Sequence, residues 1–354
     1  MPGILRGHRA QTLRGARHGM AQASQVKVWI KRVVPWLVAA GLLAYVFHAV
    51  PFSRMWGELR RVGFWGVFVF SVIYFVYAYA ADVLATWATF RWFCAPLKLW
   101  DVVLIRGATY LLAMVNYTLG QGGIIYIVGR RHGVGVARAT GTVLLTMGVM
   151  LVALLLLGGI GSYLGDPHDA RLRMVRIICT GGLAAFALYL VVIAIRPGFL
   201  ARRALLQPLF DAGILGTFKA FLVRFPHVVG HVVFQWILLR MFHVDLPFAA
   251  AATLLPVVFV IAWLPITVQG LGTQQVAAME LIGKYATGAT LEEQRAQIVA
   301  WGLTVTAVFV VYSILTGLCC LRGATALAAA PPPGDAGASA ADDAPAPSRA
   351  GESL

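Results

Sequence analysis

Charged side chains are scarce in this sequence, and their scarcity decides the class of protein. Asp, Glu, Lys and Arg together make up 12% of the 354 residues, against roughly 25% in a typical soluble domain. Hydrophobic residues make up 60%, and the mean hydropathy is +0.79. A chain of this size needs a large polar surface in water, so this composition excludes a soluble globular protein. Lipid must be the solvent for much of the chain.

The sequence also lacks the patterns of metal, redox and common catalytic sites. Its four cysteines show neither Cys-x-x-Cys nor Cys/His spacing, so neither a zinc site nor a redox pair is expected. No HExxH motif, glycine-lysine phosphate loop or glycine-flanked nucleophilic serine occurs. Asp166, His168 and Asp169 are interpreted as a solvated loop. We therefore expect no catalytic activity, no metal and no cofactor.

Acidic residues are absent before Glu58, whereas the first 32 residues hold seven Lys and Arg. The net charge is +15, but no nucleic-acid-reading motif accompanies it, so no nucleic-acid partner is expected. The basic residues lie between apolar runs, where they set topology and contact anionic headgroups. Residues 1–32 are predicted to be a cytoplasmic leader before an uncleaved signal anchor. Abundant Ala and Gly favour a bacterial cell membrane, and a mitochondrial transit peptide is the alternative.

Eight apolar runs predict an all-α, polytopic transmembrane bundle. About 20 apolar residues cross a bilayer, and these runs are continuous rather than alternating, which favours helices over a barrel. We expect 6–8 spans within a domain at 33–322, with one or two re-entrant segments, and a disordered tail at 323–354. The runs cover approximately 33–50, 64–88, 102–118, 139–163, 177–195, 226–243, 248–268 and 298–321.

The run at 102–118 is short, contains Arg106 and continues into a glycine-rich stretch. If it spans the membrane, the Lys and Arg of the leader and loops before residue 248 divide twelve inside to eleven outside. If it dips in and returns, they divide seventeen to six. The positive-inside rule therefore predicts a re-entrant segment, with both the N-terminus and residues 119–138 in the cytoplasm. In the same scheme, residues 204–224 are predicted to be an amphipathic helix at the cytoplasmic surface.

Two segments, 116–123 and 265–275, combine glycine with uncharged hydrogen-bonding side chains. Glycine lets backbone approach backbone or ligand closely, and irregular backbone at membrane depth needs a protein or water-filled surrounding. Paired broken segments in the two halves of a polytopic chain point to a substrate site; ordinary extramembrane turns are the alternative. The candidate substrate-binding residues are Asn116, Gly120, Gln121, Gly123, Gln269, Gly270, Gly272 and Gln275.

Ionisable residues inside apolar runs add Asp82 and Arg106 to the candidate site. A lone charge at mid-bilayer costs about 2.5–3.5 kcal/mol on insertion scales, so a buried pair of Asp82 with Arg106 or Arg240 is expected. Structural pairing and headgroup binding are both open for Asp82. Arg240 is alternatively interpreted as an arginine that extends from a helix end to the membrane surface.

These motifs also carry a family resemblance. The order of the runs, the Asn116-led glycine motif followed by Arg130-Arg131-His132-Gly133, and a late Pro-x-x-x-x-Gly-Leu-Gly motif resemble the lysylphosphatidylglycerol synthase transmembrane-region family over roughly 30–322. That family's first motif usually reads Pro-Gly-x-x-Gly-Glu and its second usually ends in Glu. Here Leu119 takes the proline position, Ile124 the first acidic position and Gln275 the second. Any carboxylate-coupled translocation is therefore expected to differ or be absent.

The resemblance implies a flippase-like membrane protein that moves a polar-headed lipid, or presents it to another enzyme. We expect a headgroup cavity lined by the two glycine motifs and Arg106, with acyl chains remaining in lipid. Expected partners are membrane lipids, anionic or polyprenyl-linked, and envelope-biosynthesis enzymes. The alternatives are a membrane-embedded lipid transferase, a small-solute permease, and a non-catalytic accessory subunit.

Overall fold

The structure is a computed structural model that describes residues 52–115, 117–263, 267 and 270–330, together with residues 41, 44 and 48. Asn116, Gln269, the predicted leader at 1–32 and the tail beyond 330 lie outside these residues. The described chain is helical, with one isolated bridge between Val244 and Ala286. This confirms the predicted all-α class. The longer described helices are α2 (Phe52–Val62), α3 (Phe64–Phe93), α4 (Leu99–Val115), α5 (Tyr117–His132), α6 (Val136–Leu164), α7 (Ala170–Ile195), α9 (Gln207–Met241), α10 (Phe248–Trp263), α11 (Thr273–Ile282) and α12 (Leu291–Ala329).

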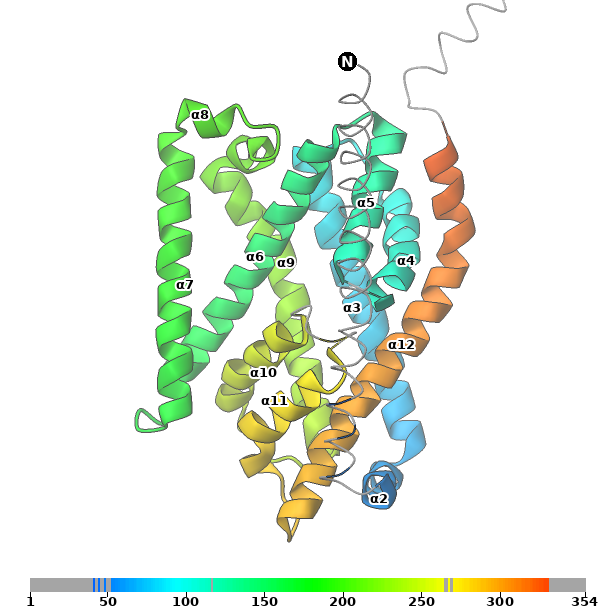
Figure 1. Ribbon diagram of the computed structural model, residues 1–354, viewed down its shortest axis with the longest axis vertical. Coiled ribbons are helices and arrows are strands. Elements are labelled where there is room, and N and C mark those ends of the chain that lie inside the picture. The colour runs from blue at the N-terminus through cyan, green and yellow to red at the C-terminus, as the bar shows by residue number, and fades with distance from the viewer. Residues whose placement is uncertain are drawn as a thin grey trace, which may run out of the picture.

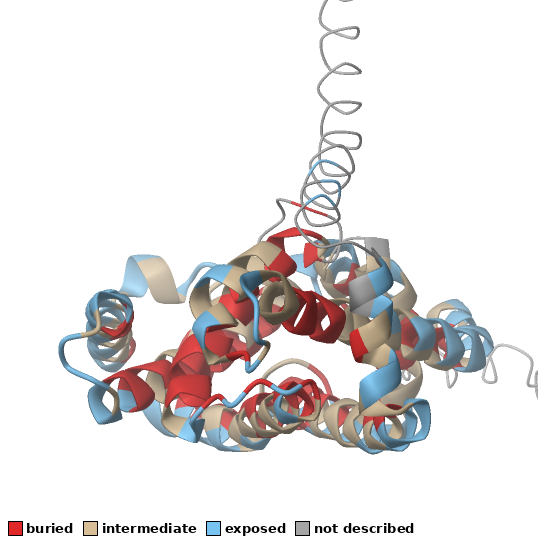
Figure 2. Cartoon of the chain, turned by 90° about the horizontal axis from the view of Figure 1, so that it is seen from below, coloured by how far each residue is buried: buried red, intermediate tan, exposed pale blue. Residues whose placement is uncertain are grey.

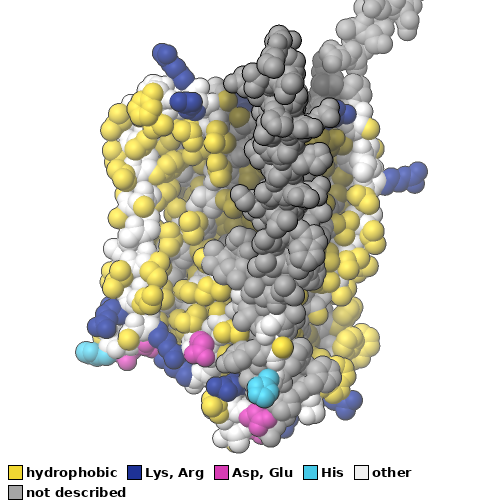
Figure 3. Space-filling model, in the orientation of Figure 1, with side chains coloured by type: hydrophobic (Ala, Val, Ile, Leu, Met, Phe, Trp, Pro, Cys, Tyr) yellow, Lys and Arg dark blue, Asp and Glu magenta, His cyan; other side chains and the backbone are white. Residues whose placement is uncertain are grey.

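Five described helices are long and apolar enough to cross a membrane, namely α3, α6, α7, α9 and α12. They are 26 to 39 residues long, which at 1.5 Å per residue exceeds the roughly 30 Å of a hydrocarbon core. Figure 3 shows apolar side chains across the middle of one face and most Lys and Arg towards its two ends. The protein is therefore a multi-pass membrane protein. The predicted first span at 33–50 falls almost wholly outside the described residues.

Two pairs of shorter helices form hairpins that return to the end of the bundle from which they start. In Figure 1, α4 enters beside the end of α3 and α5 returns to the start of α6, whereas α10 and α11 enter from the opposite end. These four helices have 10 to 17 residues. The structure thus has the re-entrant segment predicted at 102–118, and a second one at the run 248–268. Residues 119–132, however, were predicted to lie in the cytoplasm, and that prediction is wrong. They form α5, the returning helix of the first hairpin, because glycines at 120 and 123 let this segment pack closely on α4.

The two hairpins sit in equivalent positions of two oppositely directed units. One unit is α3, the α4–α5 hairpin and α6; the other is α9, the α10–α11 hairpin and α12 (Figure 1). This is the arrangement of an inverted-topology repeat, in which substrate sites lie beside broken helices near mid-membrane. Helix α7 and the four-residue α8 (Gly198–Ala201) connect the two units.

Glycines allow each hairpin to pack closely on the last helix of the other unit. A Cβ added at Gly107 of α4 would lie 2.4 Å from Sγ of Cys320 on α12. A Cβ added at Gly161 of α6 would lie 2.4 Å from Oγ1 of Thr253 on α10. Small residues at such crossings let membrane helices associate through close van der Waals packing. Buried residues accordingly gather inside the bundle, and exposed residues line its outside (Figure 2).

Two boundaries predicted from the sequence are wrong. Residues 207–241 form α9, in which Gly213 has non-helical backbone angles (φ 59°, ψ −165°). Arg224 is buried within this helix, so residues 204–224 do not form a surface helix that ends before a span. At the other end, α12 continues to Ala329, past the predicted start of the tail at 323, because Ala and Leu remain good helix formers there.

Candidate functional site

Asp82 lies well inside α3, where two arginines and a tyrosine surround its carboxylate. Nε of Arg106 donates to Oδ2 of Asp82 at 2.7 Å, and Nη2 of the same arginine also contacts that oxygen. Nη1 of Arg224 donates to Oδ1 at 2.6 Å, and the hydroxyl of Tyr110 donates to Oδ2 at 3.0 Å. The predicted Asp82–Arg106 pair is therefore present, and Arg224 of α9 is the second partner in place of the proposed Arg240.

This cluster of Asp82, Arg106 and Arg224 carries one more positive than negative charge. All three residues are at least 90% buried, with exposed fractions of 4%, 8% and 5%. Buried charges are usually paired, because an uncompensated charge in a low-dielectric interior costs several kcal/mol. One carboxylate balances only one guanidinium, and Nε of Arg224 has no hydrogen-bond partner although it is buried. The cluster is thus prepared to accept one more anion.

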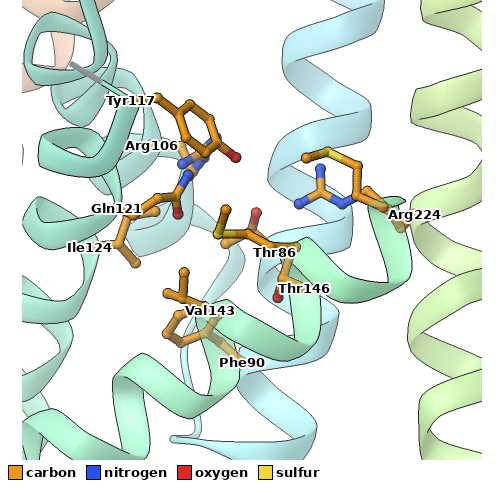
Figure 4. A pocket seen from close by; sticks show the side chains of 11 residues that line it. Thr86, Phe90, Arg106, Tyr117, Gln121, Ile124, Val143, Thr146 and Arg224 are labelled. Atoms are coloured by element: carbon orange, nitrogen blue, oxygen red, sulfur yellow. The ribbon is translucent and has the colours of Figure 1, made fainter. Parts of the chain in front are cut away.

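A small cavity adjoins the cluster. Arg106, Tyr117 and Gln121 line one side of it and Arg224 approaches from the other, from α9 (Figure 4). The rest of the lining is apolar or hydroxyl-bearing: Thr86, Phe90, Ile124, Val143, Thr146, Met147 and Met150. Its free volume of about 10 Å³ is room for about one water molecule. In this structure the cavity is therefore too small for a lipid headgroup.

The glycines of the first motif form the hairpin and do not line the cavity. A Cβ at Gly120 would lie 2.8 Å from Cβ of Ala113, and one at Gly123 would lie 2.8 Å from Cδ1 of Leu112. Both glycines therefore allow α5 to contact α4 closely. A Cβ at Gly122 would meet nothing within 4 Å. From this motif, Gln121 is the predicted site residue that reaches the cavity.

The second motif lies in the other hairpin, away from this cavity. Gly270 and Gly272 have positive φ angles of 69° and 81°, which glycine adopts without strain. Gln275 is fully buried, and its Oε1 accepts a hydrogen bond from the backbone N–H of Gly272 at 2.8 Å. This contact caps the first turn of α11. The described residues of the two motifs therefore do not line one cavity, although Nε2 of Gln275 is buried without a partner.

A polar stripe continues from the cluster along α9. Arg224, His227, His231 and Gln235 follow one another at helical spacings of three and four residues, so they share one face. The hydroxyl of Tyr74 on α3 is hydrogen-bonded to Nδ1 of His231. Oε1 of Gln235 accepts from Nε1 of the buried Trp301 at 3.1 Å. The stripe thus connects the cluster to α12 in the half of the bundle that holds the second hairpin.

A second aspartate with two arginine neighbours lies at the surface. Asp211 is 3.2 Å from Arg138 and 3.8 Å from Arg196, and its side chain is 30% exposed. Arg240 is also exposed, and it lies 4.0 Å from Asp245 and over the ring of Trp236. Its position at the end of α9 matches the alternative reading of a side chain that reaches the membrane surface.

Sequence reasoning missed Arg224 as a site residue because residues 204–224 were assigned to a surface helix that ends before the next span. The signal that could have identified it is its helical spacing from His227, His231 and Gln235, which places these four polar residues on one face of a continuous helix. Tyr117 and Thr86 were missed for a different reason. Single hydroxyl groups in apolar helices carry no spacing signal.

Comparison of the chain with protein-family models found no match, and comparison with curated proteins also found none. The resemblance to the lysylphosphatidylglycerol synthase transmembrane-region family therefore rests on the sequence motifs.

Proposed function

We propose that this protein moves a lipid with an anionic headgroup across the membrane, or presents that headgroup to another protein. The observation that carries the proposal is the excess positive charge of the Asp82–Arg106–Arg224 cluster, buried beside a cavity at a re-entrant hairpin. Guanidinium groups bind phosphate oxygens through charge-assisted hydrogen bonds. The unpartnered Nε of Arg224 is available for such a bond.

The two hairpins support movement rather than simple binding. Oppositely directed units can expose a shared midpoint first to one side and then to the other, as in transporters with inverted repeats. The small cavity fits a step between those two exposures. Membership of a flippase-like group and residence in a bacterial cell membrane, with a cytoplasmic N-terminus, remain part of this proposal.

A lipid transferase is the competing function, and it needs a carboxylate or imidazole able to take a proton from its substrate. Asp82 is poorly suited to that role, because both of its oxygens already accept hydrogen bonds from cationic groups. This disfavours Asp82 as the base of a transferase.

The test is lipid movement in proteoliposomes that contain the purified protein. Fluorescent phosphatidylglycerol, which is anionic, and fluorescent phosphatidylcholine, which is zwitterionic, are compared in the same vesicles. We expect the protein to move the anionic probe faster than the zwitterionic one. R224Q should lower the rate for the anionic probe about tenfold or more, because the variant loses a charged hydrogen bond worth about 1.5–3 kcal/mol.

The matched control is R240Q, because Arg240 lies on the same helix but is exposed. This variant should move the anionic probe at the wild-type rate. Equal rates for wild type and a well-folded R224Q would contradict the proposed role of the cluster, and no lipid movement by the wild type would contradict the proposed movement.

A further inference from the structure

His227 and His231 have no role in the site described so far, although they continue from it. His227 lies three residues after Arg224, and the charged groups near its ring are Arg224, Asp82 and Arg106. Nδ1 of His227 is buried without a hydrogen-bond partner. An imidazole nitrogen in that situation is a position where a proton can be taken up or released.

His231 lies one helical turn after His227 on α9. The two imidazole rings are 6.4 Å apart and roughly parallel, and His231 is bonded to Tyr74. On α10 its neighbour is the ring of Phe259, at 4.2 Å, which does not titrate. Tyr77 of α3 also contacts α9 here, because its hydroxyl donates to the backbone carbonyl of Pro226 at 2.6 Å. Among the described residues, the titratable and charged groups around the histidine pair are therefore Tyr74, Tyr77 and Asp82 of α3, Arg106 of α4 and Arg224 of α9.

The charges of the cluster link this pair to ligand binding. With no ligand and neutral histidines, the cluster carries one net positive charge. A singly charged anion cancels that charge, and protonation of His227 then restores it. Because the ligand removes the positive field that opposes protonation, ligand binding and proton uptake favour each other, and this coupling is reciprocal.

We propose that His227, with His231 as its neighbour in the stripe, carries one proton across the membrane together with each singly charged headgroup. This inference rests on the proposed function and adds its energy source. The loaded, protonated site has the same net charge as the empty one, so the moving unit meets the same electrostatic cost in both directions. A proton gradient would then drive the lipid, and the membrane potential would not.

The experiment uses the full-length protein in proteoliposomes, with fluorescent phosphatidylglycerol and an imposed pH difference. For one coupled proton, a difference of about one pH unit should bias the probe up to about tenfold towards the alkaline leaflet. An imposed potassium-diffusion potential should not change that ratio. Lipid movement without any pH-dependent bias would refute the coupling and leave the proposed movement intact, whereas no movement at all would refute the proposed movement.

The variants H227Q and H231Q keep hydrogen-bonding capacity but cannot titrate near neutral pH. H227Q should abolish the bias while retaining movement of the anionic probe, and H168Q, at an exposed loop histidine, should leave the bias unchanged. A full bias in H227Q would overturn the assignment. The wild-type bias tests the coupling even if a histidine variant fails to fold.

A second measurement does not depend on transport. Soluble glycerophosphoglycerol, a phosphodiester with one negative charge that does not titrate near neutral pH, is added to the purified protein in weakly buffered detergent solution, and protons taken up are counted with a pH dye. Uptake by the wild type and its loss in H227Q support the inference. Binding without uptake, detected by calorimetry, contradicts it.

Discussion

Replacing Asp82 by Asn should destabilise the protein far more than the same change at Asp211. Each aspartate has two arginine neighbours, but the side chain of Asp82 is 5% exposed and that of Asp211 is 30% exposed. D82N leaves two buried guanidinium groups without a counter-ion, which should cost about 3–5 kcal/mol. This corresponds to a loss of roughly a hundred- to several-thousand-fold in the folding equilibrium constant. D211N should cost about 0–1 kcal/mol, because solvent screens its ion pairs.

The charge argument also predicts whether a second substitution raises or lowers the stability of D82N. R224Q alone leaves Asp82 and Arg106 as a neutral pair, and should cost about 1.5–3 kcal/mol for one lost charged hydrogen bond. Added to D82N, the same change removes one of the two unpaired cations. The double variant D82N/R224Q should therefore be more stable than D82N.

The free energy of unfolding is measured for all four variants by SDS titration in the same mixed micelles, with monodisperse elution as a check of the starting state. Two results would refute the reasoning. One is an equal cost for D82N and D211N. The other is a double variant that is less stable than D82N, which would mean that geometry rather than charge balance holds the cluster together.

Three further substitutions test separate parts of the structure. G123A should lower the unfolding free energy by about 1–3 kcal/mol through overpacking. G122A meets open space inside the helix α5, so it should leave the unfolding free energy unchanged or raise it by up to about 1 kcal/mol; equal effects in the same titration would contradict the hairpin packing. G230A should destabilise the α3–α9 crossing, because its Cβ would lie 2.0 Å from a tyrosine ring, and an unchanged melting temperature would argue against this contact. The side chain of Lys284 donates a hydrogen bond to Asp169, which lowers the pKa of Asp169 and raises the pKa of Lys284. This ion pair should therefore stabilise the fold at neutral pH. The stabilisation should be lost as pH falls through the pKa of Asp169, and also as pH rises through the pKa of Lys284. K284Q should therefore be less stable than wild type at pH 7 and equal to it in acid; a stability difference that persists in acid would exclude this ion pair as its cause.

The fold could be predicted from the sequence where charge and apolar length constrain it. The distribution of Lys and Arg indicated a re-entrant segment at 102–118, because a spanning helix there would have removed the charge bias between the two sides. The helix at 207–241 could not be bounded in the same way. Asp211, Lys219 and Arg224 look like surface residues in a count of charges, and only the packed structure shows that Arg224 lies against Asp82.

Part of the candidate site could also be predicted from the positions of the charged residues. A charge inside an apolar run requires a partner, so Asp82 and Arg106 could be paired from the sequence. The choice between Arg224 and Arg240 required the crossing point of α3 and α9, which no local pattern contains. The second glycine motif was expected in the cavity, but Gly270 and Gly272 shape a turn and Gln275 caps a helix, roles that use the same residue types.

The charged cluster also has an order of assembly during synthesis. Asp82 and Arg106 are 24 residues apart and lie in consecutive helices, whereas Arg224 is 142 residues from Asp82. A nascent chain therefore emerges with the two opposite charges close together, and the Asp82–Arg106 pair can enter lipid as a neutral unit. Arg224 arrives later and joins a pair that is already balanced. The excess positive charge of the cluster, and with it the proposed anion site, exists only once α9 has inserted.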